Sequence, residues 1–141
     1  MPAIFDYVHT ATSDEIDGLG HVNNLAYLKW MQSAAIAHSA EQGWPTERYR
    51  EIGAGWVVRS HSIEYLQPAY SDDKIIVRTW VSDFKKIQSL RKYKIIRECD
   101  DALLSVAKTN WVFVSREHHV PRRVPVELRD SFELVPMHAE P

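Results

Sequence analysis

Cysteine is almost absent from this sequence, and glycine and long apolar runs are scarce. Cys99 is the single cysteine, so the chain can form no internal disulfide and no zinc site built from cysteines. All five glycines fall within the first 55 residues, which excludes a glycine-rich phosphate-binding loop from the remainder. No stretch approaches the roughly 20 apolar residues that a membrane helix needs, and the first residues lack the pattern of a signal peptide. These absences favour a cytoplasmic protein with no membrane contact.

A surplus of positive charge is also missing. The chain has 17 Lys and Arg against 19 Asp and Glu, a net charge of −2, whereas proteins that bind nucleic acid through its backbone need a basic surplus. Seven histidines are present, but H-E-x-x-H and other metal-ligand spacings are not. We therefore expect no nucleic-acid partner, no metal and no separate cofactor.

The order of apolar periodicities predicts one α+β domain over residues 1–141. Alternation with period two predicts strands, and an apolar run that starts near two asparagines and stops at Gly43 predicts a buried helix. Residues 45–53 are expected to form a loop, and the proline-containing tail from residue 117 to run over the surface, with a helical turn at 126–132. The predicted strands are 4–10, 56–66, 75–84, 90–99 and 103–115, and the predicted helix is 24–42.

Short turns between the last four strands indicate antiparallel pairing. A single sheet covers only one side of a helix that is apolar nearly all round, so a second copy of the sheet would complete its burial. A homodimer is therefore expected.

Residues 17–24, with the sequence DGLGHVNN, gather reactive groups just before the predicted helix. A helix N-terminus presents unpaired N–H groups and partial positive charge, which suits a developing oxyanion. An aspartate side chain is ordinarily a carboxylate at neutral pH, so Asp17 could serve as base or nucleophile. His21 could orient Asp17, bind substrate or only pack the turn.

The pattern D-x-x-G-H-V-N-N-x-x-Y at residues 17–27 resembles the signature of hotdog-fold thioesterases, and more narrowly of the 4-hydroxybenzoyl-CoA thioesterase-like group. Similarity continues through residues 63–69, the strand at 107–114 and residues 123–128. The resemblance implies a hotdog fold, in which a five- or six-stranded antiparallel sheet wraps one long central helix, and a homodimer or homotetramer with sites between subunits.

The resemblance also implies a role for each matching residue. Asp17 corresponds to the catalytic aspartate, and Asn24 to the position whose backbone N–H polarises the thioester carbonyl. Plant acyl-carrier-protein thioesterases share a similar run but have asparagine where this chain has Leu19, which argues against their Asn/His arrangement here.

Several further residues are candidates for substrate binding, each with a structural alternative. Asn23 suits a helix cap as well as a ligand contact, and Tyr27 suits either core packing or an acyl pocket. Basic residues could meet the phosphates of coenzyme A or be ordinary surface charge; these are Lys85, Lys86, Arg91, Arg122 and Arg123.

The sequence thus predicts an acyl-CoA thioesterase that converts a small-molecule acyl-CoA to free acid and coenzyme A. A thiolate leaves readily, because a thiol pKa is near ~8.5, so one carboxylate and one oxyanion donor suffice. Two alternatives stay open: a thioesterase acting on acyl-carrier protein, and a non-catalytic acyl-CoA binding module on the same fold.

Overall fold

The computed structural model describes residues 3–141, and their order of elements matches the α+β pattern predicted from the sequence. Five strands are present: β1 (Ile4–Thr10), β2 (Ala54–Tyr65), β3 (Lys74–Phe84), β4 (Gln88–Arg97) and β5 (Ala102–Ser115). The α-helices are α1 (Asn24–Glu41), α2 (Thr46–Ile52) and α3 (Val126–Asp130), and two short 3₁₀ helices cover Ser13–Glu15 and Met137–Ala139. All five predicted strands are therefore confirmed, with small shifts at their ends.

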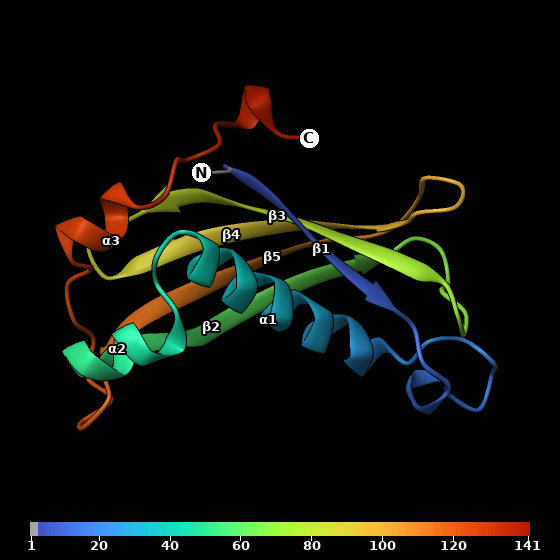
Figure 1. The fold of residues 1–141 in the computed structure, drawn as a ribbon, viewed down its shortest axis with the longest axis horizontal. Coiled ribbons are helices and arrows are strands. Elements are labelled where there is room, and N and C mark those ends of the chain that lie inside the picture. Colours follow the sequence, from blue (N-terminus) through green and yellow to red (C-terminus); the bar gives the residue numbers. More distant parts are fainter. Residues whose placement is uncertain (1–2) are drawn as a thin grey trace.

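The strands form one antiparallel sheet in the order β1-β3-β4-β5-β2. Sequential hairpins join β3, β4 and β5, as the short turns predicted, while β1 and β2 are the edge strands (Figure 1). Because β4 ends at Arg97, Cys99 lies exposed in the following turn, whereas the sequence predicted a strand that continues to residue 99. A five-stranded antiparallel sheet with a helix on one face agrees with the hotdog layout that the resemblance implies.

Helix α1 lies along one face of this sheet and buries one side of itself (Figure 1). Trp30, Met31 and Ala34 are at most 2% exposed, whereas Leu25 is 70% exposed and Ile36 58%. The sequence predicted burial nearly all round, which is not what the single chain shows. The reason is that one sheet layer can cover only the flank that faces it.

Helix α2 lies in a segment, residues 45–53, for which the sequence predicted a loop, and that prediction was wrong. Pro45 precedes its first turn, where a proline costs no hydrogen bond, and Gly53 ends it with φ of +68°. Proline at the start and left-handed glycine at the end are typical helix boundaries. The helix is short, and without tertiary contacts a helix of this length is marginal.

The core consists of two apolar clusters, and the α1 residues among them all belong to the first. The first joins α1 to β1 and the inner faces of β3 and β4. The second surrounds Trp44 and Phe113 and includes Leu128 and Phe132 from the C-terminal segment. Because Leu128 and Phe132 are buried, the C-terminal segment is part of the core. The prediction that the tail runs over the surface was therefore wrong for this part of it.

Candidate active site

Residues 17–24 form a closed loop that leads directly into α1. The Asp17 N–H donates to the His21 carbonyl at 2.7 Å, which draws the two ends of the turn together. Gly20 has φ of +83°, a left-handed conformation that residues with a Cβ adopt only with strain. The glycine therefore lets the loop fold back and hold Asp17 beside the start of the helix.

The Asp17 carboxylate has one oxygen held and one free. Oδ1 accepts hydrogen bonds from the backbone N–H groups of Leu19, at 2.9 Å, and His21, at 3.2 Å. Oδ2 accepts no hydrogen bond from any residue in 3–141. The loop backbone thus fixes the orientation of the carboxylate and leaves the second oxygen able to accept a proton or attack an electrophile.

The N-terminus of α1 is capped at one N–H and open at another. The Asn23 side chain accepts a hydrogen bond from Leu25 N–H at 2.7 Å, so Asn23 is the N-cap of α1. Asn24 is the first helical residue, and its backbone N–H has no partner within the described chain. An unpaired N–H at the positive end of an 18-residue helix is a ready donor to an oxyanion.

Asp17, His21, Asn24 and Tyr27 line one cavity of about 300 Å³. Its opposite wall is the end of β2 and the following turn, residues 65–68. The sequence predictions for these four residues therefore converge in space, and Asn23 lies at the same helix start as the cap. His21 also packs edge-on against Tyr70, with ring centroids 5.7 Å apart.

Tyr27 belongs to the core and to the cavity wall at once. Its side chain is 2% exposed, and this burial raises the pKa of its hydroxyl. Its ring packs edge-on against Tyr65 at 5.1 Å, and the Tyr65 hydroxyl donates to the Asn24 carbonyl at 3.3 Å. Tyr65 was not singled out from the sequence, although it lies in the segment 63–69 whose resemblance was noted.

Glu15, like Tyr65, was not among the candidate residues predicted from the sequence. Its carboxylate receives hydrogen bonds from Trp30 Nε1 at 2.8 Å and from Thr12 N–H at 2.9 Å, and contacts His9 Nε2 at 2.9 Å. Partial burial opposes ionisation, but these contacts, His9 foremost, outweigh it and lower the pKa of the Glu15 carboxyl. The spacing Thr12-x-x-Glu15, a capping-box pattern, was a readable signal.

Replacing Glu15 by Ala should destabilise the fold by about 1–2 kcal/mol, the scale of charged hydrogen bonds reduced by partial exposure to solvent. Because the folded carboxyl pKa is lowered, its contribution is present above the ordinary pKa of 4.5 and is lost as the pH falls through the folded pKa. Urea unfolding of the wild type, Glu15→Ala and Glu15→Gln at several pH values measures this. A difference between wild type and Glu15→Gln that does not shrink below pH 4.5 would contradict it.

Comparison with known protein families identifies the superfamily to which the chain belongs and the kind of bond that its members hydrolyse. The family model described as the thioesterase-like superfamily matches residues 11–132. The chain belongs to this superfamily. It is thus a member of a family of thioester hydrolases, and the match spans the Asp17 loop, α1 and all of β2 to β5.

Solved structures with the same fold are numerous, although they are distant in sequence. A 1,4-dihydroxy-2-naphthoyl-CoA thioesterase from Synechocystis superposes with a TM-score of 0.83 at 18% identity, covering 91% of this chain and 94% of that one. A gentisyl-coenzyme A thioesterase gives 0.83 at 19% identity, covering 92% and 100%. A Staphylococcus aureus protein solved in complex with CoA gives 0.84 at 15% identity, covering 91% and 80%. These likenesses establish the hotdog fold.

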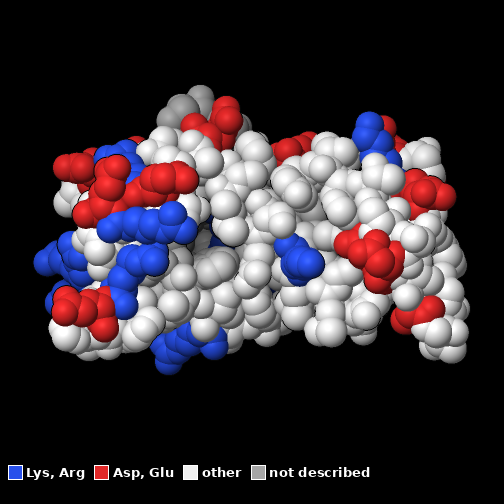
Figure 2. Space-filling model, turned by 60° about the horizontal axis from the view of Figure 1, so that its bottom comes forward, with Lys and Arg blue, Asp and Glu red and all other residues white. Residues whose placement is uncertain are grey.

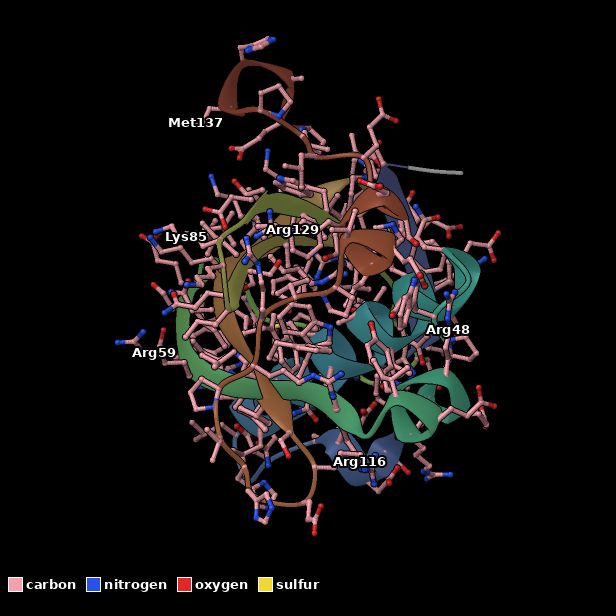
Figure 3. All side chains as sticks on the ribbon, turned by 90° about the vertical axis from the view of Figure 1, so that its left-hand side faces the viewer. Arg48, Arg59, Lys85, Arg116, Arg129 and Met137 are labelled. Atoms are coloured by element: carbon pink, nitrogen blue, oxygen red, sulfur yellow. The ribbon has the colours of Figure 1, made fainter. Side chains whose placement is uncertain are left out.

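The predicted basic residues of this thioesterase-family chain lie away from the Asp17 cavity. The Asp17 loop is at one end of the molecule, and the β3–β4 turn with Lys85 and Lys86 is at the other, beside α2 and α3 (Figure 1). Arg122 donates to the Ile52 carbonyl at 2.9 Å, which places it and the exposed Arg123 at that same end. Figure 3 looks onto this end and shows Lys85 with Arg116 and Arg129.

Arg91 differs from the other basic candidates because it points inward. It is 5% exposed and lies on the inner face of β4, in phase with the buried Tyr93 and Ile95. The structure therefore does not group it with Lys85 and Lys86 on the surface. On the face drawn in Figure 2, Lys and Arg side chains gather at one end beside a hollow, with Asp and Glu side chains among them.

Within residues 3–141, no three His, Cys, Asp or Glu side chains converge in a way that could hold a metal ion. Among the same residues, no helix combines the length and apolar character needed to cross a membrane.

Proposed function

We propose that this protein is an acyl-CoA thioesterase, which adds water to an acyl-CoA thioester and releases the free acid and coenzyme A. One observation carries the proposal: Asp17, which has one carboxylate oxygen without a partner, and Asn24, whose backbone N–H is unpaired in the described chain, line the same cavity at the head of α1. Family membership supplies the class of bond; the Asp17 carboxylate would serve as nucleophile or base, and the Asn24 N–H as oxyanion donor.

The chemistry needs few groups because the leaving group is a thiolate. The thioester carbonyl oxygen would lie toward the Asn24 N–H, whose pull is reinforced by the α1 dipole as negative charge develops. Asp17 Oδ2 would either take a proton from the attacking water or attack the carbonyl itself, forming an anhydride that water then opens. In both routes the C–S bond breaks without a strong general acid, because the departing thiol has a pKa near ~8.5.

We further propose that the working unit is a homodimer or homotetramer. Leu25 and Ile36 remain exposed on the flank of α1 that the sheet does not cover, and the outer edge of β2 has no partner strand within residues 3–141. Antiparallel pairing of two β2 edges would set the basic end of one copy beside the Asp17 cavity of the other. Lys85, Lys86, Arg122 and Arg123 of the second copy could then meet the phosphates of coenzyme A.

The proposal is tested by a panel of acyl-CoA thioesters, from acetyl to palmitoyl and including aromatic acyl groups, with free thiol release as the readout. Aromatic members belong in the panel because two structural neighbours are named as thioesterases of aromatic acyl-CoAs. We expect catalytic turnover of at least one acyl-CoA.

The same panel separates the competing functions. A strong preference for matched acyl groups on acyl-carrier protein would favour the carrier-protein thioesterase. Tight acyl-CoA binding without turnover at any chain length would favour a non-catalytic binding module and would remove the proposed activity.

A further inference from the structure

A second cavity, of about 350 Å³, lies at the end of the molecule opposite the Asp17 loop. It is bordered by the second half of α1, by α2 and by the inner face of the sheet, and it has no lining residue in common with the Asp17 cavity. Six of its lining residues are aromatic: Trp44, Tyr49, Trp56, Phe84, Trp111 and Phe132. A concave, apolar space of this volume is of the size that binds small molecules.

Arg91 lines this aromatic cavity from the inner face of β4. Its Nη1 donates to Thr79 Oγ1 at 3.1 Å and to His38 Nδ1 at 2.9 Å. Its Nε and Nη2 make no hydrogen bond within residues 3–141. The guanidinium is thus anchored through one nitrogen, and its remaining donors are left for another acceptor.

No carboxylate of the described chain pairs with Arg91. Other arginines do have such partners: Arg78 pairs with Asp6 at 2.8 Å, and Arg97 with Asp100 at 3.0 Å. Burial lowers the pKa of Arg91, and the charges that oppose this are only those of Tyr93 and Tyr49. A guanidinium nevertheless stays protonated in proteins, and a buried charge without a counter-ion is costly.

We propose that the Arg91 cavity binds a small aromatic carboxylate, whose carboxylate pairs with the free guanidinium nitrogens while its ring packs against the aromatic walls. A carboxylate fits because the guanidinium fork matches its two oxygens. A phosphate group fits less well, since Arg91 is the one buried cation among the residues that line the cavity and offers too few donors for a doubly charged group. The site shares no lining residue with the Asp17 cavity of the same chain, and its test does not depend on thioesterase activity.

The test compares 2-naphthoate with 2-naphthamide, which has nearly the same shape without the charge, by calorimetric titration of the purified protein. We expect naphthoate to bind at least about tenfold more tightly and to raise the melting temperature, while naphthamide does neither. Arg91→Met should abolish this preference, and Arg91→Lys, which keeps a charge but loses the fork, should retain part of it.

Arg116 gives a matched control because it is the other arginine that lines the cavity, but it is exposed. Arg116→Met should keep the preference for naphthoate. Asp17→Asn should keep it too, so loss of thioesterase activity and loss of this site are distinguishable. Equal binding of acid and amide, binding of neither, or an unchanged preference in Arg91→Met would overturn the proposal. If Arg91→Met fails to fold, the comparison of naphthoate with naphthamide in the wild type and in Arg91→Lys still tests the proposal.

Discussion

Replacing Asp17 by Asn should lower kcat for acyl-CoA hydrolysis by about 10²–10⁴-fold, the usual contribution of a general base. The substitution is nearly isosteric, and the amide oxygen can still accept the hydrogen bonds from Leu19 and His21 that hold the loop. What disappears is the negative charge of a carboxylate that lines the cavity. Free thiol release from the best substrate of the panel measures the effect.

Asp14 offers the control for this variant. It lies in the same surface segment, and its carboxylate is bonded to the Thr12 hydroxyl and does not line the Asp17 cavity. Asp14→Asn should keep kcat within about twofold, because no step of the proposed chemistry uses that charge. Full activity in Asp17→Asn would remove Asp17 from the mechanism, whatever the control shows.

Replacing Asn24 by Pro should lower kcat by about 10²–10³-fold, the typical cost of losing one oxyanion donor. Proline has no backbone N–H, yet it is favoured at the first position of a helix. The residue before a proline must be extended, and Asn23 already is, with φ of −66° and ψ of 139°. The variant therefore deletes the donor while the helix start keeps its conformation.

Asn24→Ala is the matched control, because it removes the side chain and retains the N–H. We expect it to keep most of the wild-type kcat, and we expect both variants to unfold near the wild-type melting temperature. If Pro and Ala lower the rate equally, the side chain of Asn24 acts and the backbone N–H does not.

Much of the site was readable from the sequence because its parts are close along the chain. Asp17, His21, Asn24 and Tyr27 fall within eleven residues, so a turn followed by a helix places them around one helix end whatever the rest of the fold does. The capping role of Asn23 follows from the same local geometry. The strands were predictable for a similar reason, since alternation within one strand reports which side chains share a face.

Arg91 shows what the alternation of side chains along a strand can predict and what it cannot. Its alternation with Tyr93 and Ile95 on β4 could have placed it on the inner face, but its basic neighbours suggested a surface cluster. No pattern along the chain could show that Thr79 and His38 lie against it, or that no carboxylate does.

The sequence by itself determined the strands, the main helix and the grouping of Asp17 with the helix N-terminus, because each depends on neighbours within a few residues. Only the tertiary structure decided that the C-terminal segment is part of the core, that Tyr65 lines the Asp17 cavity, and that the exposed basic candidates lie at the far end of the same chain while Arg91 is buried. These depend on contacts between segments that are remote in sequence, and periodicity within one element carries no information about what packs across from it.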